Sequence, residues 1–489
     1  MIEKKDDYED KFEDELDEMY YGFIEDEQAN NKLSMPSFIE GFVKSATEVS
    51  KYNYVPAAIT AFVLLGQICK DKVALVSGRR IEDTRIPFLW MQTSGTGKTE
   101  MYNFFGPVSR KTFQILNEKH QTDFTIFDIT EITDAALIGS LKQEEQIIED
   151  EDGNRKKVYI DIPIKGALEG NGLIVYDEFE YSGVFKQSQH RENVVLYLNT
   201  LMNSLHGQNW KITKKLKDGD EPIVCLCRRS PYACSYIPEG LTKVISEKGV
   251  LQRMLIFIWE VPQHIQDEIR ESVIREVGTK IDNVAPINKF ANGFVKIYEA
   301  LDEKYIEVGE NSEMVISYSD NFNDALMREF WSMKNYIANS RPEVLSIAGN
   351  FITRMNNHLV RMSVLCCIAE APSIKDKSKR YVVNTKHVLQ ASSLIRQCYK
   401  SLVSWLDIAL KVQKKTLEDR ANVSAFRDSY TELKDNTGWV SKTRLFAKVR
   451  ETTGKHDSTL YKWWQTIEEH FEQKRIAKRV YVKLKEENK

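Results

Sequence analysis

Long apolar runs are missing from this 489-residue sequence. No uninterrupted stretch approaches the roughly 18 apolar residues that a membrane-spanning helix needs. The N-terminus is strongly acidic, whereas a secretory signal peptide combines basic residues with an apolar segment. We therefore expect a cytoplasmic protein without a membrane partner.

Cysteine and overall charge are also scarce. The seven cysteines include no C-x-x-C pair, and the whole chain has eight histidines. This pattern excludes a disulfide framework and a conventional zinc site, so reduced and mostly buried thiols are expected. The net charge of −4 decides little about nucleic acid, because the charges are distributed unevenly along the chain. The length allows two or three domains.

The acidic residues are concentrated at the start. Residues 1–34 begin with a stretch in which 13 of the first 30 side chains are acidic and three are lysines. Such a block repels itself, which predicts a solvated, disordered tail. Interleaved aromatic and aliphatic residues leave a second interpretation open, a helical docking peptide for a partner or for a basic groove. Residues 35–80 are apolar and predict two helices that pack on the following domain.

Residues 92–99, with the sequence QTSGTGKT, are the most informative segment, because they follow an apolar run and precede a helix-like pattern. Closely spaced glycines let successive backbone N–H groups turn toward one anion, and the lysine can reach the β- and γ-phosphates. Gln92 replaces the first glycine of the pattern G-x-x-x-x-G-K-S/T, so the backbone there must keep a negative φ. ATP is the predicted ligand. The predicted nucleotide-binding residues are Ser94, Gly95, Thr96, Gly97, Lys98 and Thr99.

Residues 173–178, with the sequence LIVYDE, form an apolar strand that ends in two adjacent carboxylates. We predict that Asp177 supports Mg²⁺ together with the Thr99 hydroxyl, and that Glu178 polarises the attacking water. An ordinary buried strand with a charged end is the alternative. The preceding Lys98 and the pairing of the two acids favour ATP hydrolysis over binding alone.

Two β-hairpins are predicted around these motifs. A short helix over 133–141 precedes two β-prone runs within 146–162, joined by an Asp-Gly-Asn turn. Residues 210–222 contain an Asp-Gly turn and a basic arm. Lysines on such an arm can simply protect a strand edge, or they can contact phosphates of nucleic acid. The lysines concerned are Lys211, Lys214, Lys215 and Lys217.

The order of these parts resembles the AAA+ replicative helicases of the minichromosome maintenance type, over about residues 80 to 400. The resemblance rests on the two nucleotide motifs, the hairpin insert, the segment Gly166-Ala167-Leu168 and the hairpin at 210–222. It implies a ring of subunits, with a hexamer as the expected form. The region before residues 92–99 is short, so the chain resembles the compact helicases of phages and mobile elements. This resemblance implies a bacterial host cell.

The resemblance also implies roles for three further residues. By position, Ser230 corresponds to the family's sensor 1, with Arg228 or Arg229 as alternatives because the family has asparagine there. Arg253 corresponds to the arginine finger that acts on a neighbouring subunit's ATP, and a surface salt bridge is its alternative role. Arg354 corresponds to sensor 2.

The predicted fold class is α/β, with an AAA+ core at 81–284 and a helical lid at 285–412. A charged segment at 412–422 predicts a linker into a domain at 423–489. Its order of helix, short strand, two helices and two strands predicts a winged helix-turn-helix. Its recognition helix is expected from about Asp457 to Gln473, capped by Asp457 or Ser458. The module can bind DNA or protein. Its predicted nucleic-acid contacts are Lys462, Arg475, Lys478 and Arg479.

These features together predict an ATP-dependent, ring-forming DNA helicase with single-stranded DNA in its channel and duplex DNA on the winged helix. A loader or a primase is a candidate partner. Two other functions remain open: an origin-binding initiator or helicase loader without processive unwinding, and an ATP-binding DNA scaffold with weakened turnover. The acid pair Asp177 and Glu178 argues against the scaffold.

Overall fold

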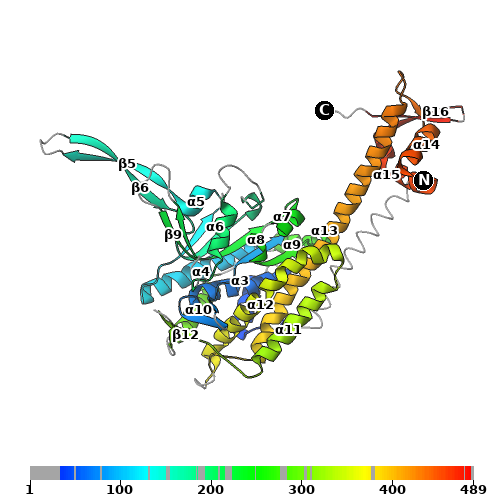
Figure 1. Cartoon of the computed structure of the whole chain (residues 1–489). Helices are drawn as coiled ribbons and strands as arrows, with labels where there is room; N and C mark the ends of the chain where they lie inside the picture. Colours follow the sequence, from blue (N-terminus) through cyan, green and yellow to red (C-terminus); the bar gives the residue numbers. More distant parts are fainter. Residues whose placement is uncertain are drawn as a thin grey trace. The chain divides into compact units, whose positions relative to one another are not determined.

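The computed structural model describes residues 33–485, apart from residues 49–50, 78–79, 130–132, 150–154, 183, 186–192, 207–209, 215–222, 248, 276–282, 302–305, 309–310, 376–379 and 478. The chain divides into two compact units, Met1–Leu406 and Asp407–Lys489 (Figure 1). The predicted acidic tail therefore lies almost entirely outside the described residues.

A parallel sheet forms the centre of the first unit, with the strand order β10-β3-β9-β7-β4. Its strands are rich in aliphatic and aromatic residues because both faces are covered, and every residue of β3 and β10 is buried. The α/β class predicted from the sequence is confirmed. The strands are β3 (Phe88–Gln92), β4 (Phe124–Ile129), β7 (Gly170–Tyr176), β9 (Ile223–Ser235) and β10 (Leu255–Trp259).

Helices cover the sheet (Figure 1). The two helices predicted in 35–80 are confirmed as α2 (Ser37–Ala46) and α3 (Tyr54–Cys69). Because α3 is apolar on all sides, it is a central helix, buried throughout from Pro56 to Cys69. The long helix α4 (Lys98–His120) follows the loop after β3, and α6 (Val194–Leu201) lies between β7 and β9 in the sequence.

Both predicted hairpins are present. In the first, β5 (Gly139–Glu149) pairs antiparallel with β6 (Arg155–Lys165). The helix before it, α5 (Asp134–Ile138), is shorter than predicted because Gly139 has a φ of 115°. A side chain at that position would collide with the backbone of the opposite strand, so glycine ends the helix and starts the hairpin.

The second hairpin pairs β8 (Lys211–Lys214) with the start of β9. Its turn, including Lys215 and Lys217, lies outside the described residues.

The region predicted as a lid consists mainly of helices, but it also supplies strands. A separate four-stranded sheet has the order β11-β12-β1-β2, so it joins residues of the predicted lid to the segment before β3. Its strands are β1 (Val73–Ser77), β2 (Arg80–Glu82), β11 (Ile306–Val308) and β12 (Asn311–Val315). The helices are α9 (Gln263–Arg275), α10 (Val284–Ala300), α11 (Phe322–Ala338), α12 (Pro342–Glu370) and α13 (Thr385–Leu433).

The segment predicted as a linker, 412–422, lies within helix α13, a few residues after the boundary between the two units. The segment is charged, which suggested a linker, but charged residues such as Lys, Glu and Arg are good helix formers. The 49 residues of the helix contain no glycine or proline that would interrupt it.

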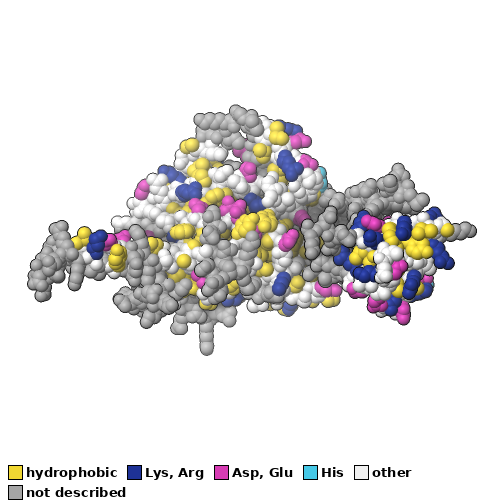
Figure 2. All heavy atoms as spheres, turned by 90° about the horizontal axis from the view of Figure 1, so that it is seen from above, with side chains coloured by type: hydrophobic (Ala, Val, Ile, Leu, Met, Phe, Trp, Pro, Cys, Tyr) yellow, Lys and Arg dark blue, Asp and Glu magenta, His cyan; other side chains and the backbone are white. Residues whose placement is uncertain are grey.

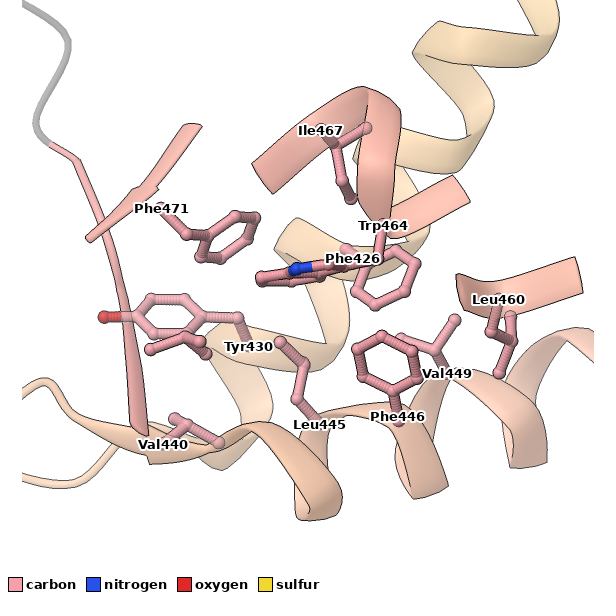
Figure 3. Close-up of a cluster of buried hydrophobic side chains, with 11 residues drawn as sticks. Phe426, Tyr430, Val440, Leu445, Phe446, Val449, Leu460, Trp464, Ile467 and Phe471 are labelled. Carbon is pink, nitrogen blue, oxygen red and sulfur yellow. The ribbon is translucent and has the colours of Figure 1, made fainter. Parts of the chain in front are cut away.

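The second unit contains the end of α13 followed by β15 (Val440–Ser441), α14 (Lys442–Thr453), α15 (Asp457–Ile467), β16 (Phe471–Ile476) and β17 (Arg479–Leu484). Its three strands form an antiparallel sheet with the order β15-β17-β16. Figure 3 shows its core, in which side chains from both ends of the unit, such as Phe426 and Phe471, surround the indole of Trp464.

Two details of the second unit differ from prediction. Helix α15 ends at Ile467, well before the predicted end near residue 473, because Phe471 begins a strand and buries its ring in the core. The cap is neither Asp457 nor Ser458. Instead, the ring nitrogen Nδ1 of His456 accepts a hydrogen bond from the Ser458 backbone N–H at 3.4 Å.

All seven cysteines are free and buried, as the sequence predicts. Among the described residues, no helix combines the length and the apolar character that a membrane crossing needs.

Candidate functional site

The loop between β3 and α4 turns on two glycines, Gly95 with a φ of 74° and Gly97 with a φ of 95°. Gly97 also caps α4, whose first backbone N–H groups have no partner within the helix. The helix dipole adds partial positive charge at the same place. Gln92, which replaces the first glycine of the pattern, is not among the residues with positive φ, as the sequence predicts. The loop is thus shaped to accept an anion.

Lys98 lies across this loop. Its Nζ donates hydrogen bonds to the carbonyl oxygens of Gln92 at 2.7 Å and Thr93 at 2.9 Å. Burial lowers the pKa of Lys98, and the negative charges of Glu180 and Asp177 partly oppose that shift. The ammonium group of Lys98 is therefore held against the loop carbonyls.

Asp177 and Glu178 follow β7 directly, at the carboxyl edge of the sheet, and both are exposed. Glu178 has a φ of 59° and a ψ of 48°, a left-handed conformation that costs a non-glycine residue energy and that is often found at functional sites. The strand register explains why these acids approach Lys98: β9 lies between β3 and β7, and all three strands end at the same edge.

A third acid, Glu180, belongs to the same group and was missed from the sequence. It is only 3% exposed, and Ser235 Oγ donates a hydrogen bond to its Oε2 at 2.6 Å. Burial raises the pKa of Glu180, and this hydrogen bond opposes the rise. Two features of the sequence could have pointed to this acid. Acids flank Phe179 on both sides, and the polar residue Ser235 follows the apolar part of β9.

The structure corrects the assignment of Ser230 as a sensor. Ser230 pairs with Leu173, three residues before the end of β7, so it lies roughly 10 Å inside the carboxyl edge. It is fully buried, and its Oγ donates to Gln67 Oε1 at 2.7 Å. Ser235, the last residue of β9, occupies the edge instead.

Arg228 and Arg229, the alternative candidates for the sensor, also lie away from the carboxyl edge. Arg229 donates to backbone carbonyls of β4 and β7, including those of Thr125 at 3.0 Å and Leu173 at 3.1 Å. Arg228 forms an ion pair with Asp71 at 2.8 Å. Both arginines precede Ser230 on β9, so they lie still further from the carboxyl edge.

A pocket of about 370 Å³ lies between Tyr52 and α9. One wall is Tyr52, whose neighbour Asn53 donates a hydrogen bond to the Thr96 carbonyl at 2.9 Å. The other wall is α9, from which Glu268 accepts a hydrogen bond from the Tyr52 hydroxyl. The remaining lining residues are Glu48, Ile269, Glu271, Ser272 and Arg275. The pocket has an aromatic ring and several carboxylates, which suits a flat ligand with hydrogen-bond donors.

Arg253 lies at the opposite edge of the sheet. It precedes β10, whose first residue, Leu255, donates its backbone N–H to the carbonyl of Pro87, just before β3. Arg253 Nη1 donates to the Asn199 carbonyl at 2.9 Å and to Asn203 Oδ1 at 3.1 Å. The five residues of β10 separate the two edges by roughly 16 Å.

Arg354 lies on α12, which contacts α8 (Gly249–Gln252), the helix directly before Arg253. Burial lowers the pKa of Arg253, and the positive charge of Arg354 lowers it further. Seven residues along α12, buried Arg361 donates to Glu82 Oε2 at 2.9 Å and to the carbonyl of Arg85 at 3.0 Å, again at the amino edge. In the part of the chain that the structure describes, Arg354 has no hydrogen-bond or ion-pair partner. The structure thus separates the predicted site residues into two groups.

The predicted nucleic-acid contacts lie on exposed elements where they are described. Lys211 is exposed on β8, with its Nζ 5.0 Å from the centre of the Trp210 ring. Lys214 is the last residue of β8. In the second unit, Lys462 on α15, Arg475 on β16 and Arg479 on β17 are exposed. Lys215, Lys217 and Lys478 lie outside the described residues.

Figure 2 shows Lys and Arg side chains gathered on the second unit around exposed hydrophobic ones. The exposed hydrophobic residues include Tyr461 on α15 and Ile476 at the end of β16, which are 58% and 55% exposed. Lys474 lies over the Trp439 ring at 3.8 Å. A basic surface with interleaved aromatic rings suits contact with phosphates and bases.

Within the described residues, no three side chains among His, Cys, Asp and Glu lie close enough together to ligate a metal ion. A magnesium ion at this site would therefore need Thr99, Asp177 and phosphate oxygens as joint ligands.

Neither the protein-family models nor the curated proteins compared with this chain match it. The geometry of the site is therefore the basis for assigning a function.

Proposed function

We propose that the chain is an ATP-driven, ring-forming DNA helicase of the AAA+ type, similar to the compact replicative helicases of phages and mobile elements. The observation that carries the proposal is the division of charged groups between the edges of one sheet. Lys98, Asp177 and Glu178 lie at the carboxyl edge, whereas Arg253 lies at the amino edge and Arg354 lies on α12, which contacts the helix directly before Arg253.

At the carboxyl edge, the residues match the requirements of phosphoryl transfer to water. The loop N–H groups and Lys98 would hold the β- and γ-phosphates, and Thr99 and Asp177 would hold Mg²⁺. Glu178 would polarise the attacking water. Ser235, at the end of β9, and Glu180, just after β7, would face the γ-phosphate. They would take the sensor role predicted for Ser230.

The pocket between Tyr52 and α9 would hold the base of the nucleotide. The Tyr52 ring lies 6.4 Å from the Trp259 ring, and the Trp259 carbonyl accepts a hydrogen bond from the Thr93 backbone N–H. Tyr52, a wall of the pocket, is therefore linked to the loop through Trp259. Its carboxylates would accept hydrogen bonds from the exocyclic amino group of adenine.

At the amino edge, Arg253 lies roughly 16 Å from the carboxyl edge, too far from its own subunit's loop to stabilise charge there. A ring in which each subunit presents its amino edge to the next subunit's carboxyl edge would complete the site. The proposal therefore includes a homo-oligomer, with a hexamer as the expected form.

Two surfaces would contact DNA. The hairpin of β8 and β9 carries the lysines that would follow the phosphate backbone of one strand in the channel. The second unit has the element order of a winged helix, and its α15 presents Tyr461 and Lys462 on an exposed face. That unit would bind duplex DNA through α15 and the β16–β17 turn.

Replacing Lys214, Lys215 and Lys217 by alanine is expected to weaken DNA binding equally for all sequences. Each lost phosphate contact should reduce the slope of log affinity against log salt by about one unit. Unwinding should fall further than binding, because translocation needs the contact at every step. Titrations at several salt concentrations, with strand-displacement rates, measure both effects.

The matched control removes three lysines that lie on other elements of the first unit and are more than half exposed. Its binding and its salt slope should stay near those of wild type. Normal unwinding by the hairpin variant would show that the hairpin is only a protected strand edge. The control lysines are Lys44, Lys119 and Lys386.

An origin-binding initiator or helicase loader is the second candidate, favoured by the basic and aromatic surface of the second unit. The two functions differ in assembly and product. A closed ring that displaces an annealed strand with ATP is a helicase, whereas an open or transient assembly that binds origin DNA without displacement is an initiator or loader. Strand displacement with and without ATP, together with the mass of the assembly, separates the two.

A further inference from the structure

The loop between β3 and α4 rests on a buried network of amide side chains. Gln92, which stands where the phosphate-loop pattern has its first glycine, is fully buried. Its Oε1 accepts a hydrogen bond from Trp90 Nε1 at 2.7 Å. Its Nε2 donates to Thr96 Oγ1 at 2.8 Å and to Asn53 Oδ1 at 2.9 Å. The Gln92 side chain therefore ties the start of the loop to its far end.

Asn53 completes the network from a different part of the chain. It is 1% exposed and precedes α3, 43 residues before Thr96. Its Nδ2 donates to the Thr96 carbonyl at 2.9 Å, and the same oxygen accepts a second hydrogen bond from Gln92 Nε2 at 3.2 Å. Thr96 Oγ1 in turn donates to the Thr93 carbonyl at 2.6 Å. Loop, strand and preceding helix are thus held together by groups that water does not reach.

We infer that Gln92 and Asn53 are positioning residues for the nucleotide: they hold the loop in the shape that directs its N–H groups at the phosphates. The inference rests on the proposed function of this loop as the ATP site. Donors that are already in place bind a charged group more tightly than donors that must first be ordered. The network would also link the base pocket at Tyr52 to the phosphate loop.

By the motif alone, glycine at position 92 would be expected to favour phosphate binding, whereas the hydrogen-bond network predicts the opposite. Changing Gln92 to glycine would restore the usual pattern, but it would leave buried Trp90 Nε1 and Asn53 Oδ1 without these partners and give the loop more freedom. Gln92→Gly is therefore expected to bind ATP more weakly than wild type, by about tenfold.

The experiment measures the Kd of MgATP for the full chain, well below its unfolding temperature. Gln92→Gly, Asn53→Ala and Gln92→Met should all weaken binding, the last because methionine keeps the volume but loses the hydrogen bonds. Gln92→Met is the mildest of the three changes, because it adds no charge and leaves no large cavity, and it serves if a larger change prevents folding.

Gln67→Ala is the matched control. Gln67 is a fully buried amide in α3 whose Nε2 donates to Asn171 Oδ1 at 3.0 Å and to the Arg228 carbonyl at 3.1 Å. Its loss should lower the unfolding temperature as the Gln92 changes do, but leave the Kd within about twofold of wild type.

Two results would overturn the inference: Gln92→Gly binding MgATP as tightly as wild type, or Gln67→Ala weakening binding by the same factor as Gln92→Gly. A different result bears on the proposed function itself. If wild type and Lys98→Ala both fail to bind MgATP, the loop is not an ATP site, whereas binding by wild type alone keeps that function whatever the Gln92 variants do.

Discussion

Lys98→Ala is expected to abolish ATP binding, whereas Glu178→Gln is expected to bind ATP and stop hydrolysing it. Lys98 is the cation that lies across the loop, so its removal leaves the phosphate charges without their main side-chain partner. Glutamine at 178 keeps the size of the side chain but cannot accept the proton of the attacking water. General-base loss costs roughly 10²–10⁴ in rate. Equilibrium binding and steady-state ATPase assays measure the two effects separately.

Two neighbouring acids sharpen this test. Glu100, an exposed residue in the first turn of α4, is the matched control, and Glu100→Gln should keep near wild-type turnover. Glu180→Gln should keep its hydrogen bond to Ser235 in part and reduce turnover less than Glu178→Gln. If Glu178→Gln hydrolyses ATP at the wild-type rate while Glu180→Gln does not, the buried acid polarises the water and the assignment of Glu178 is wrong.

The second large effect is expected from Arg253→Ala, which should lower the rate of hydrolysis by roughly 10³–10⁵ with little change in ATP affinity. The guanidinium would act on charge that develops on a neighbour's γ-phosphate in the transition state, not on the bound ground state. Arg354→Ala should also slow hydrolysis, because its helix α12 contacts the helix directly before Arg253. ATPase rates at saturating ATP, with Kd values from direct binding, check both variants.

Arg270→Ala is the control for this pair. Arg270 is 55% exposed on α9 and pairs only locally with Asp267, so its loss should be nearly silent. A wild-type rate for Arg253→Ala would mean that its hydrogen bonds to Asn199 and Asn203 are its whole role.

The parts of the site that are contiguous in sequence could be predicted from it. The phosphate loop, with its two glycines and negative φ at Gln92, follows from local chain geometry, and so does the strand that ends at Asp177. The two hairpins could be predicted from their Asp-Gly turn residues and from the β-prone runs beside them. The alternative role for Arg253, a surface salt bridge, does not match its hydrogen bonds to a carbonyl and an amide.

The remaining parts depend on the register of distant strands. Ser230 and Ser235 both lie on β9, and only the pairing with β7 shows that the second one reaches the carboxyl edge. Asn53, directly before α3, donates a hydrogen bond to the loop. The sequence predicted that this helix packs on the core, but it did not show which residues the helix region contacts. Similarly, the composition of 412–422 could not show that α13 continues, since charged residues suit both a linker and an exposed helix.

The central claim is that each ATP site is completed by two copies of this chain, and mixing two inactive variants tests it most directly. Lys98→Ala subunits keep Arg253, and Arg253→Ala subunits keep the phosphate loop. In randomly mixed rings, about a quarter of the interfaces would pair an intact loop with an intact arginine, so ATPase should return to a comparable fraction of the wild-type rate. If verified mixed oligomers recover no activity, Arg253 does not act across a subunit boundary, and the account is contradicted.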